Sequence, residues 1–154
     1  MKKIEVEIPD GKCAKWVNGV LTLVDDDVTK RIKTLEDACN ELGNAHPLVT
    51  QYFLNVTTAY NGYPMTEDFI AFLKLRIIAA ALNEGWEPTF VAGESRWYPW
   101  FSAIQGVLEC TNANKAGVLS YAVNGVRLAF KSRELAEYAG KQFVDIYKDF
   151  LWKK

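Results

Sequence analysis

Histidine and cysteine are scarce in this sequence. Its 154 residues include one histidine, His46, and three widely separated cysteines, Cys13, Cys39 and Cys110. No Cys-x-x-Cys pair occurs, so the spacing indicates neither a disulfide framework nor a zinc site. One histidine cannot form a histidine-rich metal site, and nothing places a cysteine beside it. We therefore expect free thiols in a reducing compartment, with no metal and no cofactor.

Long apolar runs are also missing. No uncharged apolar stretch reaches the roughly 18 residues of a membrane-spanning helix, so we expect no membrane partner. The first residues, Met1-Lys2-Lys3-Ile4-Glu5, lack the apolar core of a signal peptide, which predicts a cytoplasmic protein. The hydrophobic share of 49% is too high for a disordered chain and sufficient for one core. We expect a single domain over residues 1–154.

Common catalytic motifs are absent. The chain contains no Gly-x-Gly-x-x-Gly, no Gly-x4-Gly-Lys-[Ser/Thr] and no Gly-x-Ser-x-Gly. Three carboxylates near an aromatic segment, Glu84, Glu87 and Glu94, give only a weak indication of acid–base catalysis. Asp25-Asp26-Asp27 lacks further ligands at calcium-loop spacing, so we interpret it as a turn whose last residue caps a helix.

Alternating apolar residues predict several strands. A strand is expected over residues 4–8, and a β-hairpin joins residues 14–17 to 20–24 across Asn18-Gly19. Short strands over residues 101–104 and 107–110 should surround Gln105-Gly106. A second hairpin is expected around Asn124-Gly125, with one arm made by Val126, Leu128 and Phe130.

Four helices are predicted from apolar residues at helical spacing. They cover residues 28–42, a segment from Pro47 to Asn61-Gly62 that pairs antiparallel with the first, residues 66–84, and a last helix capped by Ser132. Apolar residues surround the 66–84 helix, so we expect it to form the buried centre of an α+β domain. Lys74 and Arg76 interrupt it, and a structural ion pair is expected for Arg76. Gly140 should mark a close approach to a neighbour.

Two features suggest a binding surface. Residues 96–101 are rich in aromatic side chains, which seal a core or anchor a partner, and residues 115–154 carry 8 basic and 4 acidic side chains. The candidate binding residues are Arg96, Trp97, Tyr98, Trp100, Arg127 and Lys131. Arg133 and Lys141 join them as candidate phosphate contacts if the partner is a nucleic acid.

Four segments resemble one family of proteins. The segments are WVNGVLTLV (16–24), LKLRII through NEGWEP (73–88), RWYPWF (96–101) and RLAFKSRELAEYAGKQF (127–143). Together they resemble a family of uncharacterised proteins encoded by phages, prophages and mobile elements of gut bacteria. The resemblance implies a bacterial host and assigns no catalytic or binding residue.

These observations favour a non-enzymatic binding or interaction protein of phage or mobile-element origin. Its partner is a protein, including a second copy of the chain, or, with weaker support from the acidic pI of 5.9, a nucleic acid. The alternative hypothesis is a small enzyme with a carboxylate- or thiol-based site near residues 86–101. A purely structural domain, such as a virion or host-takeover component, is a third hypothesis.

Overall fold

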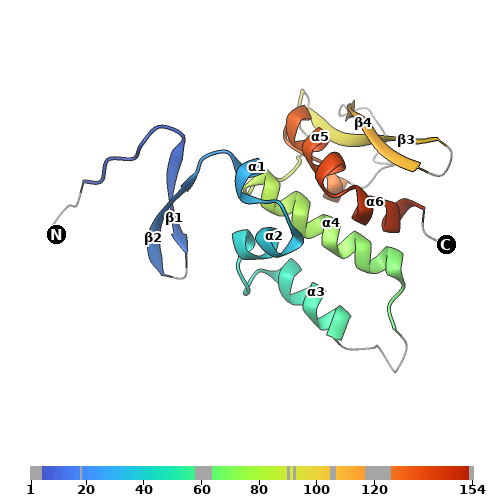
Figure 1. Ribbon diagram of the computed structural model, residues 1–154, viewed down its shortest axis with the longest axis horizontal. Helices are drawn as coiled ribbons and strands as arrows, with labels where there is room; N and C mark the ends of the chain where they lie inside the picture. Colours follow the sequence, from blue (N-terminus) through green and yellow to red (C-terminus); the bar gives the residue numbers. More distant parts are fainter. Residues whose placement is uncertain are drawn as a thin grey trace.

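A computed structural model describes residues 5–17, 19–57, 64–89, 91, 93–104, 107–116 and 126–152. Within these ranges the chain forms six α-helices, one short 3₁₀ helix and two antiparallel two-stranded sheets (Figure 1). This architecture confirms the predicted α+β single-domain fold. In chain order the elements are β1 (Lys12–Val17), β2 (Val20–Asp25), α1 (Val28–Arg31), α2 (Leu35–Leu42), α3 (Pro47–Thr57), α4 (Glu67–Asn83), β3 (Arg96–Ile104), β4 (Val107–Ala116), η1 (Val126–Leu128), α5 (Arg133–Gln142) and α6 (Val144–Leu151).

The first predicted hairpin is confirmed, because β1 and β2 pair antiparallel. Gly19 in its turn has a φ of 80°, which glycine adopts without a Cβ clash, and Asn18 lies outside the described residues. The strand predicted over residues 4–8 is wrong for residues 5–8, which are exposed and belong to no strand. Alternation alone does not form a strand, since its backbone groups need a partner.

The single helix predicted over residues 28–42 is wrong, because α1 and α2 are separate. Thr34 and Asp37 form a capping box that begins α2: each side chain accepts a hydrogen bond from the other's backbone N–H, at 3.1 and 2.9 Å. Ile32, between the helices, has extended backbone and is fully buried. A local cap and a buried apolar residue thus replace a continuous helix.

The end of α2 and the start of α3 lie where the sequence predicts them. Gly43, with a φ of 86°, ends α2, and α3 begins at Pro47. His46 Nδ1 accepts a hydrogen bond from the backbone N–H of Leu48 at 3.2 Å, so this side chain has a polar contact at the start of α3. The two helices pack mainly on α4 rather than forming the predicted pair with each other. Residues 58–62, at the predicted helix end, lie outside the described residues.

The longest helix, α4, has the predicted bounds. Thr66 is its N-cap, and Glu84 and Gly85 end it with φ values of 50° and 84°. Nine of its 17 residues are buried. It contacts α2 and α3 on one side and α5 and α6 on the other (Figure 1). Helices α2, α3, α5 and α6 therefore all pack on α4.

Lys74 and Arg76 are half-buried on α4. Within the described ranges neither forms an ion pair, so the ion pair predicted for Arg76 is wrong. The Arg76 guanidinium instead lies 6.0 Å from the centre of the Phe72 ring. Burial and the nearby charge of Arg127 lower the pKa of Arg76.

The sheet of β3 and β4 is longer than the predicted short strands, and Gln105-Gly106 between them lies outside the described residues. Helix α5 packs on both strands. Its Gly140 confirms the predicted close approach, since an added Cβ would clash with Cys110 Sγ and lie 2.8 Å from Pro99 Cβ. The missing side chain therefore brings α5 against the sheet.

The second predicted hairpin is wrong in its second arm, because residues Val126–Leu128 form η1. Beyond η1, Phe130 exchanges two backbone hydrogen bonds with Trp97, at 3.0 and 2.8 Å, in an isolated bridge. The turn at Asn124-Gly125 and the first arm lie outside the described residues. A single bridge is enough to place Phe130 in the core, where it is fully buried.

The last predicted helix divides into α5 and α6. The Ser132 hydroxyl accepts a hydrogen bond from the backbone N–H of Leu135 at 3.3 Å, which confirms the predicted cap. The break occurs at Phe143, whose φ of −114° is not helical and whose side chain is buried. Stacking of Phe150 on Phe72, with ring centres 5.9 Å apart, then fixes α6 against α4.

Candidate functional site

The β1–β2 hairpin stands apart from the rest of the molecule. In Figure 1 it lies at one end of the chain's body, beyond the packed helices, and the N-terminal segment extends past it. Its main neighbour is the short helix α1. Each of its two strands has one long edge that no other strand in the described ranges pairs with.

One face of this hairpin is apolar and exposed. The register places Trp16 opposite Leu21 and Ala14 opposite Leu23, and residues two apart on a strand share a face. Trp16 is 74% exposed, and both leucines are also exposed. We call these four residues the apolar hairpin face. The opposite face carries the Lys15–Thr22 pair and also Val17 opposite Val20, which are 44% and 64% exposed.

A cluster of charged side chains joins the hairpin to the helices. It contains Lys15 from β1, Arg31 from α1, Glu41 from α2, Glu84 after α4 and Lys131 before α5, and we call it the charged cluster. Lys15 binds the Glu41 and Glu84 carboxylates at 2.5 and 3.2 Å. Arg31 binds the same two carboxylates at 2.9 and 2.6 Å. Five elements or connections thus meet at two carboxylates.

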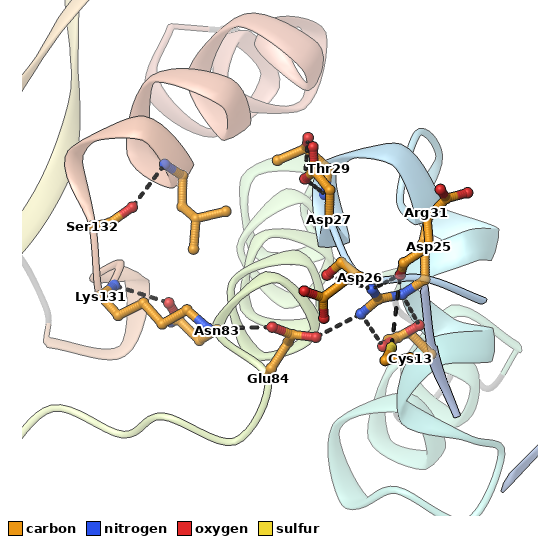
Figure 2. A network of polar contacts seen from close by, with 12 residues as sticks. Cys13, Asp25, Asp26, Asp27, Thr29, Arg31, Asn83, Glu84, Lys131 and Ser132 are labelled. Carbon is orange, nitrogen blue, oxygen red and sulfur yellow. Dashed lines mark hydrogen bonds and ion pairs between the residues drawn. The ribbon is translucent and has the colours of Figure 1, made fainter. Parts of the chain in front are cut away.

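Arg31 is the most enclosed member, with a side chain only 9% exposed. Figure 2 shows its guanidinium between Glu84 and the chain at Asp25 and Asp26. It donates to the backbone carbonyls of both aspartates, at 3.1 Å for Asp26. Because those carbonyls lie at the end of β2, Arg31 fixes the base of the hairpin to α2 and to the end of α4.

The end of α4 is tied in turn to the segment before α5. Asn83 is buried; its side chain donates to the Ala129 carbonyl at 2.8 Å and accepts from the Lys131 N–H at 3.0 Å (Figure 2). The Lys131 ammonium reaches Glu84 at 3.3 Å. Glu84 holds its place with a left-handed φ of 50°, which is uncommon without glycine.

The cluster keeps its carboxylates ionised. Burial favours the neutral form of Glu41, but hydrogen bonds from Arg31 and Lys15 outweigh it and lower its pKa. The same balance, with Lys131 added, lowers the pKa of Glu84. Despite burial, the pKa values of Lys15 and Arg31 are raised by the two carboxylates. Carboxylates held ionised in this way suit structural ion pairs between elements better than proton transfer near neutral pH.

The aromatic segment lies along β3, and its candidate residues have different environments. Arg96 is 2% exposed, out of reach of an external phosphate. Trp97 packs against the core and bridges to Phe130, and Tyr98 is half-buried. Trp100 alone among them is exposed, at 55%. The segment is thus mainly part of the packed sheet, with one tryptophan left at the surface.

Most of the candidate basic residues have carboxylate partners. Lys131 binds Glu84, whereas Arg133 and Lys141 bind Glu137 at 2.8 and 3.9 Å. Arg133 also donates to the Asn112 side chain. Arg127 is exposed on η1. Lys131 is thus held at the charged cluster, whereas Arg133 is bonded to Asn112, which pairs with Trp100 across the sheet.

The residues suggested for an enzymatic site do not converge. Glu84 belongs to the charged cluster, Glu87 is exposed, and Glu94 accepts from the Thr89 N–H at 3.0 Å. Cys110 faces Gly140, and burial raises the pKa of its thiol, which disfavours the reactive thiolate.

The last of the three consecutive aspartates has a local structural role. Asp27 accepts from the Thr29 N–H at 2.9 Å and caps α1, as predicted. Among the residues whose placement is described, no group of three or more histidine, cysteine or acidic side chains is arranged to hold a metal ion.

Sequence reasoning missed the two features that define this site. The alternation of Ala14 and Trp16 on β1, and of Leu21 and Leu23 on β2, was an available signal for one apolar face. Nothing in the sequence showed that this face would lack a covering helix. The charged cluster joins residues up to 116 positions apart, from Lys15 to Lys131, and had no local signal.

Neither the helices nor comparisons with known proteins indicate what this site binds or does. None of the helices in the described ranges is long and apolar enough to cross a membrane. No protein-family model, curated protein or solved structure matches the chain.

Proposed function

We propose that this chain is a non-enzymatic protein-interaction domain whose binding surface is the β1–β2 hairpin. The observation that carries the proposal is the exposure of Trp16 on a hairpin held away from the core, with Leu21 and Leu23 beside it. Contiguous apolar groups on a surface favour association, because a partner removes them from water. Tryptophan is also among the side chains that contribute most to protein interfaces.

The hairpin offers backbone as well as side chains. A strand edge presents unpaired N–H and C=O groups, so an extended peptide can add to it by main-chain hydrogen bonds. The charged cluster supports this use, because it fixes the hairpin base and leaves the apolar hairpin face outward. A hairpin positioned in advance loses less conformational freedom when it binds.

The proposal extends to the setting of the protein. The resemblance of residues 16–24, 73–88, 96–101 and 127–143 to a family from phages and mobile elements supports a bacterial host. The free thiols of Cys13, Cys39 and Cys110 suit the reducing cytoplasm of that host. A cytoplasmic partner protein, or another copy of this chain, fits both.

The other hypotheses have less support. A nucleic-acid surface would lose Arg96, which is buried, and would compete with Glu84 for Lys131. An enzyme near residues 86–101 would need converging acid, base or thiol groups, and Glu87, Glu94 and Cys110 do not converge.

The test compares two exposed tryptophans on different sheets. A photo-crosslinking amino acid replaces Leu21 in the chain expressed in a bacterial host, and crosslinked products are identified by mass spectrometry. The purified partner is then bound to the wild type, to Trp16→Asp and to Trp100→Asp by calorimetry. We expect Trp16→Asp to weaken binding by about tenfold or more, and Trp100→Asp to change it little.

The outcomes separate the hypotheses. Loss of binding with Trp100→Asp and not with Trp16→Asp would move the site to β3 and contradict the proposal. An absence of crosslinks from position 21, together with a gel shift of single- or double-stranded nucleic acid at low salt, would favour the nucleic-acid hypothesis instead.

A further inference from the structure

Residues 5–8 form an extended segment that pairs with no strand in the described part of the chain. They lie before the hairpin, are exposed, and form no backbone hydrogen bond with any residue that the structure describes. They are followed by a turn in which the Lys12 N–H donates to the Pro9 carbonyl at 3.1 Å. In Figure 1 the segment then runs away from its own hairpin. The chain therefore holds a free strand-like segment and a two-stranded sheet with open edges.

A third strand would stabilise the β1–β2 sheet, and residues 5–8 have the sequence pattern of such a strand. A two-stranded hairpin in water is marginally stable, and a third strand with an apolar face is the usual remedy. Residues 5–8 read Glu-Val-Glu-Ile, with Val6 and Ile8 on one side and Glu5 and Glu7 on the other. Paired beside β1, Val6 and Ile8 extend the apolar hairpin face next to Trp16. The glutamates then fall on the side of Lys15.

Charge selects the β1 edge over the β2 edge. The charged cluster contains three cations and two carboxylates, so Lys15 lies where one more carboxylate is favourable. The β2 strand instead leads into Asp25-Asp26-Asp27, which repels Glu5 and Glu7. The segment and the β1 edge are complementary in both hydrophobicity and charge.

We propose that residues 5–8 of a second copy add to the β1 edge as a third strand, and that the exchange is reciprocal. This inference rests on the proposed function, because it uses the same hairpin, and it names the partner as the chain itself. Reciprocal exchange closes a two-fold dimer, in which each copy gives a strand and receives one. With a formal net charge of −1, two copies repel each other little.

The test is the mass of the pure full-length chain, measured by sedimentation equilibrium up to high-micromolar concentration. We expect the wild type to form dimers, and the double variant Val6→Asp/Ile8→Asp to weaken the dimer by about tenfold or more. The matched control is Val91→Asp/Ile104→Asp, whose parent side chains are 65% and 69% exposed and belong to neither β1 nor β2. A synthetic peptide of residues 1–9 should dissociate the wild-type dimer, and the same peptide with both aspartates should not.

Each contrary result has its own meaning. A wild type that remains monomeric, or a double variant as dimeric as the wild type, overturns the strand exchange. If the dimer persists in Val6→Asp/Ile8→Asp and is lost in Trp16→Asp, the apolar hairpin faces pack directly. That result ends the strand proposal and keeps the proposed function. A monomer that still crosslinks to another protein from position 21 would contradict the strand exchange and support the proposed function. Circular dichroism verifies that the variants, which change only exposed side chains, stay folded.

Discussion

This chain contains two antiparallel two-stranded sheets that differ in what covers them. β3 and β4 lie under α5, and Cys110 and Ala113 on that sheet are buried. β1 and β2 contact mainly α1, and Trp16 on that hairpin is largely in solvent. Both hairpins contain apolar side chains at alternating positions. The same local pattern has therefore produced a core sheet in one place and an open surface in the other.

The difference lies in how each sheet is joined to the helices. Gly140 brings α5 into direct contact with Cys110 and Pro99, so dispersion and apolar burial stabilise β3 and β4. The first hairpin is joined through Arg31 and Lys15, which bind carboxylates and backbone carbonyls near its base. Ion pairs fix its position without burying its apolar face. This division suits a sheet that remains available to a partner.

The largest expected contrast is between two aromatic side chains. Phe130→Ala removes a fully buried ring beside β3 and should reduce the free energy of unfolding by about 3–5 kcal/mol. Trp16→Ala should change it by less than about 0.5 kcal/mol in the monomer. Urea unfolding followed by circular dichroism at low protein concentration measures both. A large loss of stability in Trp16→Ala would show that the hairpin belongs to the core.

The contact between α5 and the sheet gives the second prediction. Gly140→Ala should lower stability by about 1–3 kcal/mol, because its Cβ meets Cys110 and Pro99. Lys141→Ala, at the exposed next position, is the control. Thermal unfolding of the two variants is sufficient. Stabilisation by Gly140→Ala, as helix propensity alone predicts, would contradict the close packing.

The Arg31 contacts at the base of the β1–β2 hairpin give the third prediction. Arg31→Met should lower stability by about 1–2 kcal/mol by removing hydrogen bonds to two carboxylates and two carbonyls. The loss should be local, so amide hydrogen exchange should accelerate in β1 and β2 more than in α4. Lys30→Met, an exposed change on the same helix, should leave exchange unchanged. Equal acceleration in α4 and the hairpin would mean that Arg31 supports the whole domain.

The smallest expected effect depends on pH. Glu41 and Glu84 have pKa values below the ordinary 4.5 in the folded chain, so their ion pairs contribute fully above pH 4.5. That contribution is lost as the pH falls through the folded pKa values, because protonation removes the negative charges. We expect at most about 1 kcal/mol from each partly exposed pair. NMR shifts of the hairpin during an acid titration measure it, and Glu41→Gln/Glu84→Gln should lose the response.

Local signals predicted the parts of the fold that depend on neighbours in the sequence. Asn18-Gly19 predicted a hairpin, Asp27 and Ser132 predicted helix caps, and Pro47 predicted a helix start. Each of these acts through hydrogen bonds or backbone angles within a few residues. They were correct because no distant residue is needed to satisfy them.

The errors lie where distant contacts compete with a regular pattern. Ile32 and Phe143 are both buried where a continuous helix was predicted, and each turns the chain into the core. Phe130 leaves the predicted strand alternation for one bridge with Trp97. The site showed the same limit: Arg96 was a candidate for binding, and the fold buried it. Periodicity describes one element at a time, whereas burial depends on all of them.

The sequence by itself determined the features of this protein that depend on residues close together in the chain. These are the first hairpin turn, the helix caps and the long apolar helix α4. Only the tertiary structure decided which sheet is covered, because that choice depends on where α5 packs and on whether a helix reaches the hairpin. It also decided that Lys15, Arg31, Glu41, Glu84 and Lys131 meet. Charges from separate elements attract usefully only when the rest of the fold has brought them within a few ångströms.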